Sequence, residues 1–171
     1  ALPGQRVDGH EYVAEAFKRG ADLALVQKEP GGEFPVVDLR SGKLPEVLNL
    51  PAEGPLILWV GDSLKALQQT ARFWRRKLDL RVIGITGSVG KSTTKELIAE
   101  VLSQRYRTLK NIGNMNNEIG LPLTLLSLGE GHERAVLEMG FYVAGEIAFL
   151  CELSQPHVGV VTNIGTVHAE R

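Results

Sequence analysis

The chain has 171 residues, of which 43% are hydrophobic and 23% charged, and its formal net charge is −1. This composition is typical of a globular protein with a real core, and it excludes the strongly basic field that draws proteins to nucleic acids. The single cysteine, Cys151, excludes an internal disulfide and suits a reducing compartment. No apolar run approaches the roughly 20 residues that span a bilayer, so we expect a cytoplasmic protein that does not insert into membranes.

The first part of the chain predicts a small α/β unit. Asp8 is a suitable N-cap for a helix that stops at Gly20, and residues 21–26 form a short apolar strand. Residues 29–55 are rich in proline and glycine, which predicts loops around one weak strand. A buried strand at 56–60 and a helix from Asp62 to Leu78 complete the unit. That helix ends in three basic residues, 75–77, which suit a helix C-terminus better than a nucleic-acid site.

From Leu80 onward, uninterrupted apolar strands alternate with helices, a pattern that indicates a parallel sheet covered on both faces. The strands are expected at 80–86, 106–110, 134–139 and 157–164, and the helices at 92–104, 118–127 and 145–154. The predicted fold class is therefore α/β, with a small N-terminal domain at 1–79 and an incomplete P-loop-type domain at 80–171. The sequence starts without methionine and stops at "VHAER", so we expect a segment of a longer protein.

The segment "GITGSVGKSTTKE" at 84–96 predicts a phosphate-binding loop. A strand that runs into a glycine-rich turn and then a helix presents backbone N–H groups to an anion. Lys91 adds a charge for the β- and γ-phosphates, and Ser92 offers a hydroxyl to Mg²⁺. The pattern departs from the general P-loop at its first glycine, where this chain has Ile85. The phosphate-binding residues expected are Gly87, Ser88, Val89, Gly90, Lys91, Ser92 and Thr93.

Polar residues that follow neighbouring strands are candidates for the metal and the substrate. Glu138 ends an apolar strand on the side of the sheet where ligands collect, which favours metal coordination over an ordinary strand-end charge. Asn163, at the end of the last strand, and His168, just after it, lie near the same edge, and spacing alone does not decide whether His168 is structural or functional. Glu96 is better interpreted as a solvated helix charge.

Four asparagines lie between Asn111 and Asn117, just before the helix that contains Pro122. Such clusters commonly serve turns and helix caps. Amides at this edge of the sheet also suit a polar ligand, and the sequence leaves the two interpretations open.

Taken together, these motifs resemble the Mur ligases of peptidoglycan synthesis. Residues 86–93 fit that family's T-G-x-x-G-K-[ST]-[ST] loop, which lacks the first glycine. The segments "GKSTTKE", "GNMNNEIGLPLTLL", "EMG…GEIA" and "TNIGTVH" resemble the branch that joins D-alanyl-D-alanine to UDP-N-acetylmuramoyl-tripeptide through an acyl phosphate. The segment "ALPGQRVDGHEYVAEAFKRGA" and the helix "DSLKALQQTARFWRRKL" are similar to the first domain of that branch.

The resemblance implies an ATP- and Mg²⁺-dependent ligase that acts as a monomer on these two substrates. It implies that Lys91 holds ATP phosphates, that Ser92 and Glu138 bind the first Mg²⁺, and that His168 serves a second. Substrate contacts implied by the resemblance are Gln5, Arg6 and Val7 at the uridine end, and Asn114, Asn116 and Asn117 along the UDP-sugar-peptide. The family's third domain, which receives the amine, has no counterpart here, so the segment alone is expected to be inactive.

One departure bears on the substrate. After "EMG" this branch commonly has Ala-Asn-His, where the chain has Phe141, Tyr142 and Val143. Two alternatives therefore stay open: a Mur-type ligase for a different substrate, and a nucleotide-binding module without ligase activity.

Overall fold

A computed structural model describes residues 1–4, 6–43 and 54–165. It divides into two compact units, residues 1–67 and residues 68–171. This division falls inside one helix, before the predicted domain boundary at 79/80, and the functional boundary itself stays a prediction. None of the described helices is both long enough and apolar enough to cross a membrane.

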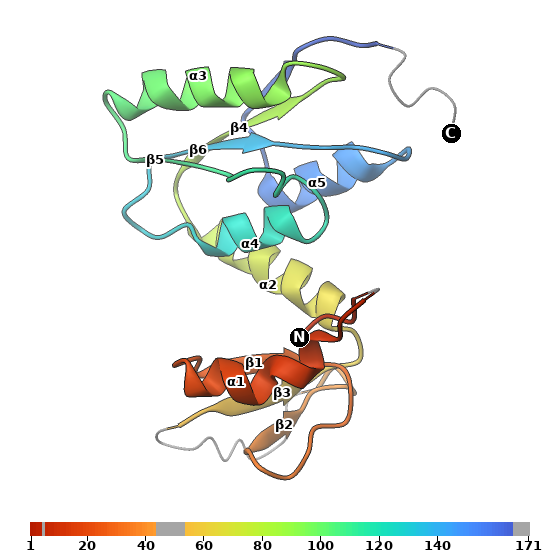
Figure 1. Cartoon of the computed structure of the whole chain (residues 1–171). Helices are drawn as coiled ribbons and strands as arrows, with labels where there is room; N and C mark the ends of the chain where they lie inside the picture. The colour runs from red at the N-terminus through yellow and green to blue at the C-terminus, as the bar shows by residue number, and fades with distance from the viewer. Residues whose placement is uncertain (5, 44–53, 166–171) are drawn as a thin grey trace. The chain divides into compact units, whose positions relative to one another are not determined.

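The first unit is a three-stranded parallel sheet with a helical segment (Figure 1). Its spatial strand order is β1-β3-β2, and both pairs are parallel. The Asp8 side chain accepts a hydrogen bond from the His10 N–H, as expected for the predicted N-cap. The elements are the 3₁₀ turn η1 (Gly9–Tyr12), α1 (Val13–Lys18), β1 (Leu23–Val26), β2 (Val36–Asp38) and β3 (Leu56–Trp59).

In the second unit, four parallel strands lie in the order β5-β6-β4-β7. Helix α2 (Ser63–Lys77) starts in the first unit and continues into the second, and the Asp62 carboxylate caps it by accepting from Lys65 N at 2.9 Å. The remaining elements are β4 (Arg81–Thr86), α3 (Lys91–Ser103), β5 (Thr108–Lys110), α4 (Gly120–Leu126), β6 (Arg134–Glu138), α5 (Glu146–Ser154) and β7 (Val158–Val161). The predicted α/β fold class, with helices on both faces of a parallel sheet, is confirmed.

Helix α3 covers one face of this sheet, and α4 and α5 cover the other (Figure 1). Because successive side chains of a strand point to opposite faces, Val136 packs with α3 while Ala135 and Leu137 pack with the helices of the other face. Gly84 faces the α4–α5 side, where an added Cβ would lie 3.0 Å from the terminal methyl of Met139. The middle strands β4 and β6 are therefore buried on both faces of the sheet, and polar groups collect where these strands end.

The basic residues that end α2 include a buried arginine. Arg75 is only 4% exposed and donates to the carbonyls of Ser154, Leu78 and Leu80 at 2.8, 3.1 and 3.3 Å. Burial lowers the pKa of this guanidinium below its ordinary value. Arg75 thus satisfies carbonyls at the end of α5 and in the connection to β4, which is a structural role.

Candidate functional site: a phosphate loop with a buried carboxylate

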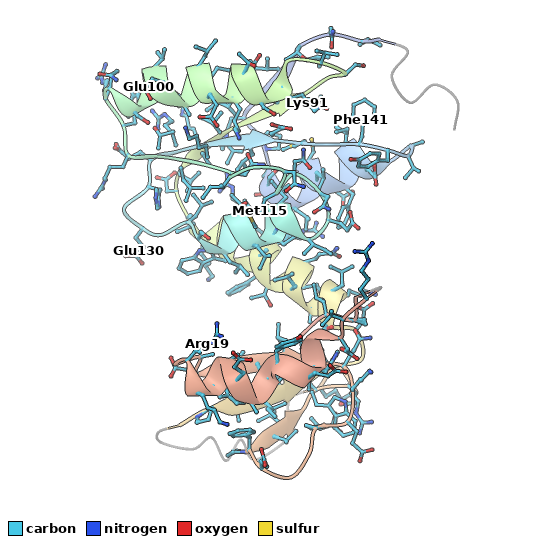
Figure 2. The ribbon with its side chains drawn as sticks, in the orientation of Figure 1. Arg19, Lys91, Glu100, Met115, Glu130 and Phe141 are labelled. Atoms are coloured by element: carbon cyan, nitrogen blue, oxygen red, sulfur yellow. The ribbon has the colours of Figure 1, made fainter. Side chains whose placement is uncertain are left out.

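The predicted phosphate loop lies between β4 and α3, with Lys91 at the start of the helix (Figure 2). Gly90 is the N-cap of α3 with φ of 85°, a left-handed conformation that glycine adopts without strain. Ile85, which stands where the general pattern has its first glycine, is still inside β4 and is completely buried. The turn begins after that position, so a glycine is not needed there.

Residues that directly follow β7 contact the phosphate loop and bond its backbone. Ser88 N donates to the Asn163 carbonyl at 3.1 Å, and Val89 N donates to Asn163 Oδ1 at 2.9 Å. Gly87 has φ of 132°, and a Cβ there would lie 2.1 Å from Thr162 Oγ1. Only glycine fits this position. The N–H groups of Ser88 and Val89 are therefore engaged by Asn163. The N–H groups of the first turn of α3 have no acceptor inside the helix, as at any helix N-terminus, so they are the ones that can face an anion.

The Lys91 ammonium is folded over the loop. It donates to the Gly87 carbonyl at 2.7 Å and contacts the Ser88 carbonyl at 3.4 Å. These acceptors are exchangeable, because a phosphate oxygen that carries charge is a stronger partner for an ammonium than a neutral carbonyl. The positive charge therefore already lies where the loop would receive an anion.

A carboxylate at the end of β6 meets the hydroxyl at the start of α3. Ser92 Oγ donates to Glu138 Oε2 at 2.7 Å, and Glu138 is only 4% exposed. Its second oxygen, Oε1, accepts from Asn116 Nδ2 at 2.9 Å. Within the described residues no group of three His, Cys, Asp or Glu side chains gathers at one point. One carboxylate and one hydroxyl fit Mg²⁺, which takes few protein ligands and keeps waters and phosphate oxygens.

Asn111, which the sequence interpretation did not single out, is the most enclosed polar residue of the site. It directly follows β5 and is 1% exposed. Its side-chain amide accepts from Glu138 N at 2.9 Å and donates to the carbonyls of Glu138 and Met115 at 3.0 and 2.8 Å. Its place one residue after a strand, among other asparagines, was the only signal in the sequence.

Helix α3 also contributes an ion-pair chain beside Asn111. The buried ammonium of Lys95 donates to the Asn111 carbonyl at 2.9 Å and lies 3.2 Å from Glu96 Oε1. Glu96 is also paired with Lys110, and the hydrogen bonds from Lys110 and then Lys95 hold the pKa of its carboxyl below the ordinary value. Glu96 is half exposed, in line with the prediction of a solvated helix charge.

The other asparagines of the cluster divide between cap chemistry and the site. Asn117 Oδ1 accepts from the N–H groups of Ile119 and Gly120 at 3.2 and 2.8 Å, so it caps α4. Asn114 is exposed, and its carbonyl accepts from Asn116 N at 2.8 Å. Asn117 also lines a small cavity whose other walls are Glu118, Gly140, Tyr142, Glu146, Phe149 and Leu150.

The segment that follows β6 is fixed by a carboxylate. Glu146 Oε2 accepts from the backbone N–H groups of Tyr142 and Val143, which lie four and three residues before it. These hydrogen bonds, from Tyr142 first and then Val143, keep the pKa of the Glu146 carboxyl below its ordinary value. Tyr142 and Val143 are therefore fixed in the bend that leads into α5.

The substrate and metal residues predicted near the two ends of the chain are only partly described. Gln5 and His168 lie outside the described residues. Arg6 and Val7 are exposed, and the Val7 carbonyl accepts from Gly4 N at 3.1 Å. Arg6 and Val7 therefore lie on the surface of the first unit.

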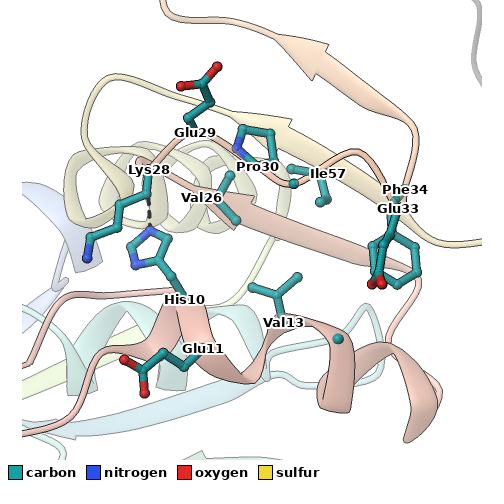
Figure 3. A pocket seen from close by; sticks show the side chains of 12 residues that line it. His10, Glu11, Val13, Val26, Lys28, Glu29, Pro30, Glu33, Phe34 and Ile57 are labelled. Atoms are coloured by element: carbon teal, nitrogen blue, oxygen red, sulfur yellow. Dashed lines mark hydrogen bonds between the residues drawn. The ribbon is translucent and has the colours of Figure 1, made fainter.

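The first unit has its own pocket of about 210 Å³ between the start of its helical segment and the loop after β1 (Figure 3). The His10 ring is fixed in it: Nε2 accepts from Gln27 N at 3.0 Å, so Nδ1 carries the proton that bonds Asp8 Oδ1 at 2.6 Å. Asp8 also pairs with Lys28. The hydrogen bond from Lys28, followed by those from His10, keeps the pKa of the Asp8 carboxyl well below its ordinary value.

The geometry of the second unit defines a class: an α/β domain of the nucleotide-binding type, whose phosphate loop faces a buried carboxylate. The sequence model of the Mur ligase middle domain matches residues 85–171. The chain belongs to the Mur ligase family.

Its relatives are longer than the chain itself. A UDP-N-acetylmuramoyl-tripeptide–D-alanyl-D-alanine ligase of Bacillus subtilis is 43% identical over 99% of this chain and 33% of the relative. The crystal structure of MurF from Acinetobacter baumannii is similar with a TM-score of 0.75 and 36% identity, covering 98% of this chain and 33% of that one. MurF ligase from Thermotoga maritima in complex with ADP matches with a TM-score of 0.75 and 34% identity over 98% of this chain and 34% of that one. The chain thus spans about a third of the length of these relatives.

Proposed function

We propose that this chain is the N-terminal part of a MurF-type ligase, which uses ATP to join D-alanyl-D-alanine to UDP-N-acetylmuramoyl-tripeptide. The observation that carries the proposal is the Ser92–Glu138 pair, at 2.7 Å, beside the Lys91 ammonium in the phosphate loop. Support comes from the names of the relatives, which share a third of their length with the chain.

In the proposed reaction a substrate carboxylate attacks the γ-phosphate of ATP, which forms an acyl phosphate and releases ADP. An amine then displaces inorganic phosphate and forms the amide. Lys91 leaves the Gly87 carbonyl for the phosphate oxygens, and the N–H groups of the first turn of α3 hold the same anion. Ser92 and Glu138 would hold Mg²⁺, which neutralises charge on the phosphates. Such groups act mainly by positioning and by stabilising the charge of the transition state.

The substrate side is assigned to the loop after β5 and the turn after β6. Asn116 donates to Glu138 Oε1, and Asn117 lines the small cavity. Asn114 is assigned with them through the family resemblance. Tyr142 lines that cavity, and its ordered turn supports a role in choosing the substrate. We assign Gln5, Arg6 and Val7 to the uridine end of the substrate, with residues 1–79 as the UDP-sugar domain and 80–171 as the beginning of the ATP-binding domain.

His168 is assigned to a second metal only through the family resemblance. We also propose a monomeric cytoplasmic enzyme. The third domain of the family would supply the amine site and shield the acyl phosphate from water. The 171-residue chain alone should therefore bind Mg²⁺–ADP without making the amide.

The test is product formation by the complete protein that contains this segment. Incubation with Mg²⁺–ATP, UDP-N-acetylmuramoyl-tripeptide and D-alanyl-D-alanine should yield the pentapeptide product and one phosphate for each amide, detected by mass spectrometry and phosphate release. Product with another amine, and none with D-alanyl-D-alanine, would replace the proposal with a different Mur-type ligase. Nucleotide binding without any amide would indicate a binding module.

A further inference from the structure

The Asn111 side chain makes the hydrogen bonds of a backbone peptide unit at the point where β5 and β6 separate. β5 pairs with β6 up to Lys110, which lies opposite Val136. Arg134 N donates to the Arg107 carbonyl at 3.3 Å. In a parallel ladder such bonds recur at every second residue, so a regular ladder would have Glu138 N donate to the Asn111 main-chain carbonyl. That carbonyl instead accepts from the Lys95 ammonium at 2.9 Å.

The Asn111 side chain takes over the missing ladder position. Its Oδ1 accepts from Glu138 N at 2.9 Å, and its Nδ2 donates to the Glu138 carbonyl at 3.0 Å. An amide side chain carries the same donor and acceptor as a peptide unit, so one asparagine satisfies both backbone groups of Glu138. β6 therefore continues to Glu138, two residues beyond its last pair with β5, while it stays paired with β4 on its other side.

The same amide fixes the loop that approaches the Glu138 carboxylate. Asn111 Nδ2 also donates to the Met115 carbonyl at 2.8 Å, and the next residue, Asn116, donates to Glu138 Oε1 at 2.9 Å. Glu138 is thus held at its backbone and at one carboxylate oxygen. Its other oxygen, Oε2, is directed at Ser92 Oγ.

The chemistry of these partners suits a cation site. A lysine or arginine bonded to Oε1 would neutralise the carboxylate and compete with a metal ion. Neutral amides orient the carboxylate and leave its negative charge in place. The nearby ammonium of Lys95 is directed at the Asn111 carbonyl and at Glu96.

We propose that Asn111 and Asn116 are positioning residues that orient Glu138 Oε2 toward the metal beside Ser92. In this role Asn111 acts through the backbone of Glu138, and Asn116 acts on its carboxylate. The inference rests on the proposed Mg²⁺–nucleotide function of the site. It assigns Asn116 to the metal carboxylate, whereas the family resemblance implied only a substrate contact.

The test is the Mg²⁺ dependence of ADP binding by the whole 171-residue chain, measured by calorimetry at a series of Mg²⁺ concentrations. Asn111→Asp keeps the size of the side chain and its acceptor but removes the donors to Glu138 and Met115. Asn116→Leu removes the donor to Oε1 from a partly exposed loop residue, so this variant should fold even if Asn111→Asp does not. Leu153→Ala, in the core between sheet and α5, is the control for a general loss of stability.

Both asparagine variants should raise the Mg²⁺ midpoint about tenfold or more, the usual effect of losing a residue that orients a metal ligand. Affinity for ADP without Mg²⁺ should stay within about twofold, and Leu153→Ala should leave the midpoint unchanged. An unchanged midpoint in folded Asn116→Leu would overturn the inference, as would an equal loss of ADP affinity with and without Mg²⁺. If the unaltered chain shows no Mg²⁺-dependent ADP binding, the proposed function fails, and the inference fails with it.

Discussion

The two compact units are built in different ways. Among the described residues of the first unit, the buried apolar side chains are Val26, Val37, Ile57 and Val60. The second unit has a large cluster on the α4–α5 face of its sheet and a second cluster under α3. At the pocket of the first unit, His10 and Lys28 are joined by polar contacts through Asp8, whereas the phosphate loop of the second unit follows a strand that is buried on both faces.

This difference indicates where precise geometry can be maintained. Apolar contacts do not titrate and are not weakened by ionic screening, while exposed ion pairs are weak and screened. A site that must hold phosphate oxygens and a metal within tenths of an ångström gains from a scaffold with a large core. We therefore expect the nucleotide site to tolerate changes of solvent that alter the first unit.

The largest expected effect is at Lys91. Lys91→Ala removes the ammonium from the phosphate loop, and we expect product formation by the complete protein to fall by a factor on the order of 1,000. Melting of the second unit should change little, because within the described part of the chain the Lys91 ammonium bonds the exchangeable carbonyls of its own loop. Turnover close to that of the unaltered protein would show that the loop is assigned wrongly.

The next comparison is between two polar residues of the second unit. Glu138→Gln keeps the shape of the side chain but removes the charge that a metal requires. We expect it to weaken Mg²⁺ binding about 100-fold. Asn117→Ala should mainly weaken binding of UDP-N-acetylmuramoyl-tripeptide. Each variant is titrated with both ligands, and equal losses on both would contradict the separation of metal and substrate residues.

A matched pair of valines tests the two cores directly. Val136 is completely buried under α3, and Val136→Ala should lower the free energy of unfolding of the second unit by on the order of 2 kcal/mol. Val37 lies in the small sheet of the first unit. Val37→Ala should lower that unit's free energy of unfolding by about 1 kcal/mol, because a thin core relaxes more readily around a cavity.

The chain's two tryptophans make this measurement possible. Trp59 lies in the first unit and Trp74 in the second. Denaturant unfolding followed in Trp59→Phe and Trp74→Phe backgrounds therefore reports each unit separately. Equal costs for the two valines would contradict the comparison between the cores.

The smallest effect concerns acid. The pKa of the Asp8 carboxyl is held below its ordinary value of 3.8 by Lys28 and His10, so the folded state favours the charged form. Its contribution to stability is complete above pH 3.8 and is lost as the pH falls toward the lower folded-state pKa. The free energy of unfolding of the first unit, reported by Trp59 fluorescence, should decrease in this pH range. Asp8→Asn should make that decrease smaller. A transition whose acid dependence is the same in Asp8→Asn would remove this carboxylate from the account.

The sequence predicted the second unit better than the details of its site. Uninterrupted apolar strands and a motif of known geometry determine β4, the loop and α3, so Lys91, Ser92 and Glu138 could be chosen in advance. The role of Asn111 could not, because it depends on which way the main-chain carbonyl turns where β5 ends. The Asn163 contact to Val89 joins residues 74 positions apart, and only the folded sheet brings them together.

The first unit was harder to predict from the sequence. β2 has three residues in a segment of prolines and glycines, and its partner β3 follows much later in the chain. Short strands of this kind are stabilised by their neighbours rather than by their own pattern.

The most direct test of the account is a crystal structure of the chain with ADP and Mn²⁺, using anomalous scattering to locate the metal. We expect one Mn²⁺ about 2.2 Å from Ser92 Oγ and from a carboxylate oxygen of Glu138, with the β-phosphate on the first turn of α3. The Lys91 ammonium should have moved from the Gly87 carbonyl to the phosphate. A nucleotide bound elsewhere, or a metal held without Glu138, would contradict the central claim that these residues form the Mg²⁺–nucleotide site.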